Sequence, residues 1–243
     1  EPMTFLVVRF APVVLLMAAV ALATRAPWPS DAAEYLHVAV VGILMHGGYL
    51  GGVFMALQLG LPAGIVSLIV GMQPILTAFA VGPLLGERVA PVQWLGVGLG
   101  FVGVALVLAD KLDFDRAGAA AVAPALVALL GVTFGTLYQK RFCAKVDLRT
   151  GAVVQYAAAG LALLPIALAQ ETMRIDWSLD FVLALAWLSL VLSVGTVSLL
   201  WVLIRRGAGA RTASLFYLVP PITALFAWAF FGETLAAQAL AGM

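Results

Sequence analysis

Long apolar stretches alternate with short polar connections along the whole chain. A helix needs about 20 apolar residues to cross the hydrocarbon core of a bilayer. Turn residues and charges separate eight stretches of suitable length, at 3–23, 34–57, 63–85, 92–110, 119–139, 150–170, 179–204 and 210–231. A ninth begins near Leu235, and the chain stops at Met243. The pattern predicts an all-α, polytopic helical membrane protein.

Composition agrees with this class and removes several others. The chain is 64% hydrophobic and 10% charged, whereas a soluble domain has about 25% charged residues. We therefore expect its outer surface to contact a lipid bilayer. The net charge of +1 offers no footprint for nucleic acid. The sequence lacks a His-rich metal cluster, a Gly-Lys-Ser/Thr phosphate loop and a Gly-x-Ser-x-Gly elbow. We expect no cofactor, no metal and no enzymatic activity.

Two blocks of the chain recur later in the sequence. Residues 63–80 align with 210–227 at an offset of 147, and Pro74 falls on Pro221. Residues 4–23 align with 150–169 at an offset of 146, and Arg9 falls on Gln155. Two homologous halves of a hydrophobic chain are typical of secondary transporters, whose substrate site lies between the halves.

The basic residues divide unequally between the two sets of loops. One set holds Arg25, Arg88, Lys140, Arg141, Lys145, Arg149, Arg205, Arg206 and Arg211, and the other holds Lys111, Arg116 and Arg174. The positive-inside rule places the first set in the cytoplasm. An odd number of helices then separates equivalent positions, so the repeats are predicted to be inverted. Residues 1–110 are expected to lack the first helix of one five-helix repeat, and 119–243 to carry the other with its last helix truncated.

The motifs within these blocks are familiar. Pro2-x6-Arg9-Phe10, a proline in the middle of a Leu/Ala-rich helix, Gly86-Glu87 closing that helix, and a Gly-rich helix after it resemble the drug/metabolite transporter superfamily, EamA type. The resemblance implies ten helices in two inverted repeats. It also implies movement of small metabolites, often amino acids, across the inner (plasma) membrane, commonly outward.

Polar residues and prolines inside the spans are the candidate site. The expected substrate-binding residues are Arg9, His46, Tyr49, Gln73, Gln155, Thr196 and Tyr217, and the expected hinge prolines are Pro74, Pro220 and Pro221. Arg9 is the one basic residue well inside a span, where a charge is costly and should face a cavity or a partner. It either anchors a substrate carboxylate or bridges helices near the interface. His46 either contacts substrate or packs.

Glycines at four-residue spacing predict close helix packing. The pairs are Gly47 with Gly51, Gly48 with Gly52, and Gly131 with Gly135. Two other functions stay open on sequence alone, a membrane-embedded enzyme and a non-transporting scaffold, as does the formation of a homodimer.

Overall fold

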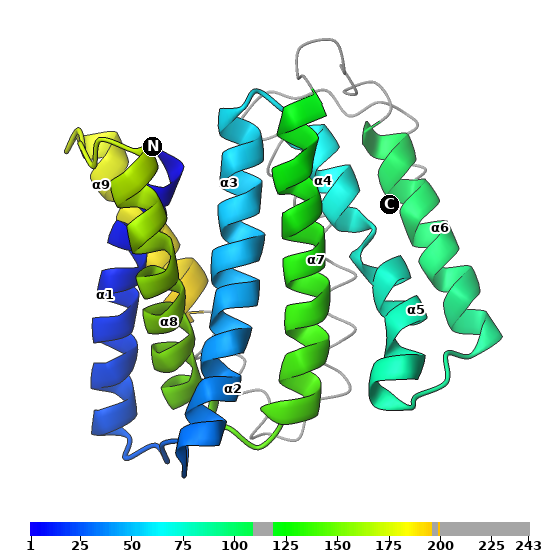
Figure 1. Ribbon diagram of the computed structural model, residues 1–243, viewed down its shortest axis with the longest axis horizontal. Coiled ribbons are helices and arrows are strands. Elements are labelled where there is room, and N and C mark those ends of the chain that lie inside the picture. The colour runs from blue at the N-terminus through cyan, green and yellow to red at the C-terminus, as the bar shows by residue number, and fades with distance from the viewer. Residues whose placement is uncertain (109–118, 196–198, 200–243) are drawn as a thin grey trace.

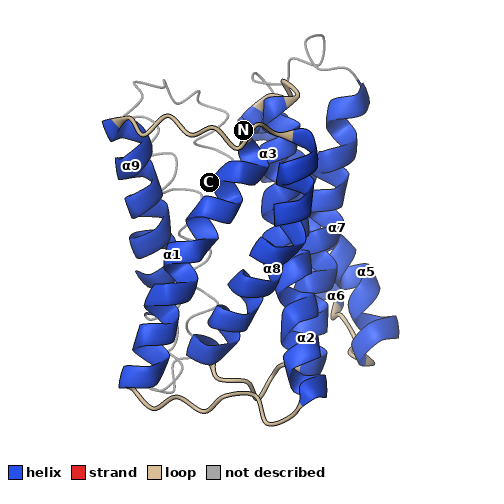
Figure 2. Cartoon of the chain, turned by 60° about the vertical axis from the view of Figure 1, so that its left-hand side comes forward, coloured by secondary structure: helices blue, strands red, loops and turns tan. Residues whose placement is uncertain are grey.

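The computed structural model describes residues 1–108, 119–195 and 199, and all regular structure in these residues is helical (Figures 1 and 2). In chain order the elements are α1 (Pro2–Ala23), α2 (Ala32–Gly42), the π-helix η1 (Ile43–Leu50), α3 (Gly51–Gln58), α4 (Ala63–Gly71), α5 (Gln73–Leu85), α6 (Pro91–Leu108), α7 (Ala119–Phe142), α8 (Leu148–Gln170), α9 (Leu179–Ala186) and the π-helix η3 (Trp187–Gly195).

Five predicted spans correspond to helices that are long and apolar enough to cross a membrane. These helices are Pro2–Ala23, Ala32–Gln58, Ala63–Leu85, Ala120–Phe142 and Leu148–Gln170. Helix α6 occupies the predicted span 92–110, and the shorter apolar helix Leu179–Gly195 covers the start of 179–204. The span 210–231 lies outside the described residues. The polytopic helical class is therefore confirmed.

An apolar stripe on α1 packs against an apolar stripe on α8. The buried residues of the first stripe include Leu6, Phe10, Val13, Met17 and Ala21, and those of the second include Ala152, Tyr156, Ala159, Leu163 and Ala167. The spacing of three or four residues keeps each set on one helix face. Each residue of the first set is related to one of the second by the repeat offset of 146. Equivalent positions of the two blocks are thus buried in one cluster.

The opposite faces of these helices are equally matched. Leu15 and Leu161 are repeat equivalents, and each is 71% exposed within the chain. An exposed leucine is costly in water but costs nothing against lipid tails, which are as apolar as leucine. The two blocks therefore share both the face that packs and the face that suits a bilayer.

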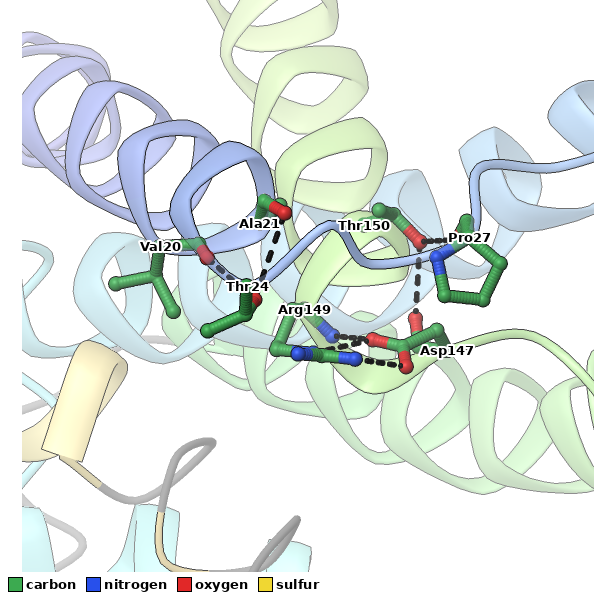
Figure 3. Close-up of polar contacts among 7 residues, drawn as sticks. All are labelled: Val20, Ala21, Thr24, Pro27, Asp147, Arg149 and Thr150. Carbon is green, nitrogen blue, oxygen red and sulfur yellow. Dashed lines mark hydrogen bonds and ion pairs between the residues drawn. The ribbon is translucent and has the colours of Figure 1, made fainter.

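Helices α1 and α8 run antiparallel and are tied at both ends. At one end the backbone N–H groups of Met3 and Thr4 donate to the Glu171 carboxylate at 2.9 and 2.6 Å. At the other end Thr150 Oγ1 donates to the carbonyl oxygen of Pro27 at 2.8 Å (Figure 3). The start of each helix thus lies beside the residues that follow the other. Opposite directions are what an inverted alignment predicts.

The connections that carry most of the described basic residues lie at one end of the bundle. The loops joining α1 to α2, α5 to α6 and α7 to α8 are at the lower end in Figure 1. These loops and the helix ends beside them hold Arg25, Arg88, Lys140, Arg141, Lys145 and Arg149. Arg174 follows α8, at the opposite end. The segregation of charge that the sequence predicts is present in the described residues.

Two segments that sequence analysis treats as ordinary α-helix are wound as π-helix. The predicted span 34–57 is continuous, but residues Ile43–Leu50 form η1 between α2 and α3. The second π-helix, η3, continues α9. Residues 43–48 of η1 align with 190–195 of η3 at the offset of 147. The wider turn therefore recurs at equivalent places in the two blocks.

The proline in the predicted span 63–85 marks a break. Helix α4 ends at Gly71 and α5 begins at Gln73, with Met72 between them. Pro74 is the second residue of α5, where a helix has no partner for the N–H that proline lacks. The predicted interruption at Pro74 is therefore present as a division into two helices.

Close packing at glycine is confirmed at some predicted positions. A Cβ atom on Gly52 would lie 2.4 Å from the Pro124 carbonyl oxygen, and one on Gly131 would lie 2.7 Å from that of Leu44. These contacts bring α3 and η1 against α7. A Cβ on Gly47 would meet nothing within 4 Å. Among the glycines whose surroundings the structure describes, the tightest is Gly42, which was not predicted: its Cβ would lie 2.2 Å from the Gln155 carbonyl oxygen.

Candidate functional site

A positive charge is buried inside the bundle on α1. Arg9 is 6% exposed, and its Nη2 donates to Ser193 Oγ of η3 at 3.3 Å. Its Nε is buried without a hydrogen-bond partner in the described residues. The ion pairs seen there, Lys140–Glu87 and Arg149–Asp147, leave Arg9 with no carboxylate from that part of the chain. A buried cation without a counter-charge costs several kcal/mol, so this position is suited to an anion.

Three aromatic rings, two of them stacked, lie beside the arginine. The His46 ring of η1 stacks on the Tyr156 ring of α8, with centroids 4.0 Å apart and an interplanar angle of 15°. Phe10 of α1 meets Tyr156 edge-on at 5.3 Å and His46 at 6.2 Å. Arg9 interacts electrostatically with Tyr156. The rings therefore form an apolar and polarisable wall next to the charge.

The polar contacts of this cluster cross between the two blocks. At the repeat offsets of 146 and 147, Gln155 is the equivalent of Arg9, and Ser193 is the equivalent of His46. Arg9 of the first block binds Ser193 of the second, and Gln155 of the second interacts with His46 of the first. The two contacts are equivalent in position but differ in chemistry. The cluster thus sits where the two blocks meet.

The two π-helices supply one residue each to this crossing. His46 lies in η1 and Ser193 lies in η3. Turns of π-helix are rare in proteins, but where they occur they are often found at functional sites. The wider turn redirects side chains relative to an α-helix. The Ser193 hydroxyl also donates to the Leu188 carbonyl at 3.2 Å, five residues earlier. The local winding of η3 therefore fixes the hydroxyl that faces Arg9.

The structure brings together some of the predicted site residues and separates others. Arg9, His46 and Gln155 meet in the cluster. Gln73 lies elsewhere, and its Nε2 donates to Thr136 Oγ1 of α7 at 3.5 Å. Tyr49 is half-buried in η1, and none of the contacts described for the cluster involves it. Four further predicted residues lie outside the described part of the chain: Thr196, Tyr217, Pro220 and Pro221.

Three residues of the cluster, Phe10, Tyr156 and Ser193, are not among the predicted substrate-binding residues. In the sequence Phe10 stands out only as part of the Arg9-Phe10 motif. The repeat alignment carries a signal for all three, because it pairs Phe10 with Tyr156 and Ser193 with His46.

A separate cavity of about 630 Å³ opens at the end of the bundle where α1 begins. Its lining includes Phe5 of α1, Phe54 and Gln58 of α3, the segment after α8, and Phe181 of α9. Among the predicted substrate-binding residues that the structure describes, none lines it. The sequence predicted a cavity between the halves at Arg9, and the cavity described here lies nearer the helix ends.

Comparison with known proteins identifies the relatives of this arrangement. The EamA-like transporter family matches residues 1–109 and 120–243. The uncharacterized transporter YvbV of Bacillus subtilis is 29% identical over 185 residues, which cover 75% of this chain and 60% of that protein. A probable amino-acid metabolite efflux pump of Salmonella typhimurium is 24% identical over 212 residues, which cover 83% of this chain and 70% of that protein.

The fold also resembles that of a solved crystal structure. Its TM-score with this chain is 0.62 at 21% identity, and the match covers 78% of this chain and 65% of the other. At that identity the likeness establishes the fold alone.

Proposed function

Because the chain belongs to the EamA-like transporter family, we propose that it carries a small metabolite bearing a carboxylate across the membrane. The observation that supports this substrate class is the buried guanidinium of Arg9, which lacks a counter-charge in the described residues. A charge-assisted contact between a guanidinium and a carboxylate is worth about 1.5–3 kcal/mol. The bound substrate supplies the missing anion.

Amino acids are the first members of this class to consider. They carry a carboxylate, and the Salmonella relative is named as a probable amino-acid metabolite efflux pump. The ring wall of Phe10, His46 and Tyr156 beside Arg9 offers an apolar surface for the rest of such a molecule. Outward movement across the inner membrane is part of the same proposal.

The proposed architecture is two inverted five-helix repeats, with residues 1–110 in one and 119–243 in the other. Substrate binds where they meet. Helices α1 and α8 are tied at both ends and serve as the fixed part. The spans 34–57, 63–85, 179–204 and 210–231 rock around them and expose the site to each side in turn. The break before Pro74 absorbs part of this motion.

A transport assay in liposomes tests the function. The reconstituted protein is given labelled L-amino acids and their uncharged amides, and we expect transport of the acids alone. Equal transport of the amides would exclude recognition of the carboxylate. Transport of neither, with correct insertion, would favour a scaffold. Chemical conversion of the added compounds, detected by mass spectrometry, would favour a membrane-embedded enzyme.

The orientation is tested by thiol labelling. The natural cysteine of the chain, Cys143, is a poor reporter, because it is 6% exposed and burial raises the pKa of its thiol, so it should react slowly. Lys145 is exposed in the same loop. On a Cys143→Ala background, we expect Lys145→Cys to react with a membrane-impermeant reagent only after cells are opened. Labelling of intact cells would reverse the predicted orientation.

A further inference from the structure

Three aromatic rings line the cavity near the start of α1. Phe5 stacks on Phe54 with ring centroids 5.6 Å apart, and Phe181 meets Phe5 edge-on at 5.8 Å. All three rings line the cavity, and all three are only half-buried. They come from three different helices, α1, α3 and α9. An apolar group placed here would be covered on several sides.

The same cavity is also lined by two opposite charges that form no ion pair with each other. Arg174 and Asp176 both line it, from the segment between α8 and α9. Within the described residues neither side chain forms an ion pair. The third charged group, Glu1, is occupied, because its Oε1 accepts from the Thr172 hydroxyl at 2.7 Å. The cavity lining therefore offers one cation and one anion to a bound molecule.

The segment that bears these charges is held in place by its neighbours. Just before it, the Glu171 carboxylate accepts from the N–H groups of Met3 and Thr4. The backbone N–H of Arg174 then donates to Thr172 Oγ1 at 3.4 Å. Anchoring on both sides of Met173 fixes where the Arg174 side chain leaves the backbone. The charges thus occupy a defined edge of the cavity.

We propose that this cavity binds a zwitterion that carries an apolar group. The guanidinium of Arg174 takes the anionic end, Asp176 takes the cationic end, and the apolar group lies on the rings of Phe5, Phe54 and Phe181. A volume of about 630 Å³ is within the range of small-molecule sites. A free α-amino acid with a bulky side chain and the headgroup of phosphatidylethanolamine both have this chemistry. The site rests on its own residues and binds whether or not Arg9 mediates transport.

Protection of an introduced cysteine tests the proposal. Gln58 lines the cavity and is exposed, so Gln58→Cys on a Cys143→Ala background serves as the reporter. The protein is placed in phosphatidylglycerol nanodiscs, which leave both faces open. We expect L-phenylalanine to slow labelling of this cysteine and L-phenylalaninamide not to do so. In a second arm, phosphatidylethanolamine in the nanodisc replaces the free amino acid.

The outcome of the two arms identifies the source of the zwitterion. Protection by L-phenylalanine identifies a free solute, and protection by phosphatidylethanolamine identifies a lipid. Protection by neither overturns the proposal, as does equal protection by the amide.

Charge variants test the recognition itself. Arg174→Gln and Asp176→Asn should each raise the concentration of L-phenylalanine needed for half-protection about five-fold, or remove an equivalent part of the lipid effect. The matched controls are Arg88→Gln, an exposed arginine at the other end, and Asp180→Asn, which is outside the cavity lining. Neither control should change protection. Unchanged protection in both Arg174→Gln and Asp176→Asn overturns the proposal.

A further variant separates this site from the proposed transport function. Arg9→Gln should leave protection of Gln58→Cys intact even where it abolishes transport. Protection without transport in the otherwise unaltered protein would reject the transport proposal and keep this one. Transport without protection would do the reverse.

Discussion

Helix α1 with η1 and helix α8 with η3 are two versions of one structure that keep the same shape with different chemistry. Five buried apolar positions of one match five of the other, from Leu6 with Ala152 to Ala21 with Ala167. Their polar positions do not match, because the first version has Arg9 and His46 where the second has Gln155 and Ser193. Packing of the apolar positions fixes how the two blocks meet. The polar residues then place one positive charge at this contact, where two copies of Arg9 would place two charges and two copies of Gln155 none.

The largest expected effect comes from disturbing the shared shape. Gly42→Ala places a Cβ 2.2 Å from the backbone oxygen of Gln155, which cannot rotate away. The helices must separate, and overpacking of this kind costs about 1–3 kcal/mol or more. We expect loss of the monodisperse peak in size-exclusion chromatography and loss of transport for every substrate. The matched control is Gly47→Ala, where nothing lies within 4 Å. Equal behaviour of the two variants would contradict the tight contact of α2 with α8.

The next effect comes from removing the chemical difference. Arg9→Gln copies the second block into the first, so the protein should fold while losing the anchor for a carboxylate. Loss of about 1.5–3 kcal/mol corresponds to roughly 10- to 150-fold weaker transport of acids. Transport rates of acids in liposomes, compared with those of the amides, provide the measurement.

The exchanged variant sharpens that test. Arg9→Gln combined with Gln155→Arg returns the charge to the equivalent position in the other block, beside His46 rather than Ser193. If the crossing contacts are interchangeable, acid transport should recover in part. Wild-type transport by Arg9→Gln alone would leave Arg9 with a structural role.

The shared shape could be predicted from sequence, but the crossing contacts could not. The length of the apolar stretches located the spans, because a helix must be long enough to cross the bilayer. Apolar periodicity located their packed faces, because each helical turn must bury a residue there. The repeat alignment gave the equivalence of Arg9 with Gln155. It did not give the π-helical turns at His46 and Ser193, since the choice between α and π winding depends on tertiary contacts rather than on local propensity. Tertiary contacts also decide where Gln73 lies. Although it is polar and adjoins the break before Pro74, it lies against Thr136 instead of in the cluster.

A smaller effect is expected from removing the hydrogen bonds at the two ends of the α1–α8 pair. Thr4 and Thr150 are identical repeat equivalents, yet Thr4 Oγ1 donates to the Glu171 carboxylate at 2.6 Å and Thr150 Oγ1 to the Pro27 carbonyl at 2.8 Å. A hydrogen bond to a charged acceptor is worth about 1.5–3 kcal/mol, against about 1 for a neutral one. Thr4→Val should therefore lower the thermal midpoint more than Thr150→Val. Thr24→Val serves as the control, because its hydroxyl bonds only within its own helix end (Figure 3). The reverse order would show that burial outweighs charge at these ends.

The smallest effect compares the residues that begin the two helices. Asp147 precedes α8, and its Oδ1 accepts from the Arg149 backbone at 2.9 Å while its Oδ2 pairs with Arg149 Nη2 at 2.7 Å (Figure 3). Its equivalent Glu1 precedes α1 but makes no side-chain cap to that helix. Asp147→Asn removes the charge and should cost about 1 kcal/mol or less at neutral pH. Glu1→Gln should cost less, because it removes no cap.

The pH dependence distinguishes that charge from mere packing. Hydrogen bonds from Arg149 lower the pKa of Asp147 below its ordinary value, so the folded state binds a proton less readily than the unfolded chain. The stabilisation is then fully present above the ordinary carboxyl pKa of about 3.9 and is lost as the pH falls through the lowered folded value. Thermal midpoints of wild type and Asp147→Asn, measured in detergent, should differ by a constant amount from about pH 5 to pH 8. They should converge under more acidic conditions. A difference in thermal midpoint that persists in acid would mean that asparagine fits poorly at the start of α8. The charge of Asp147 would then contribute nothing to stability.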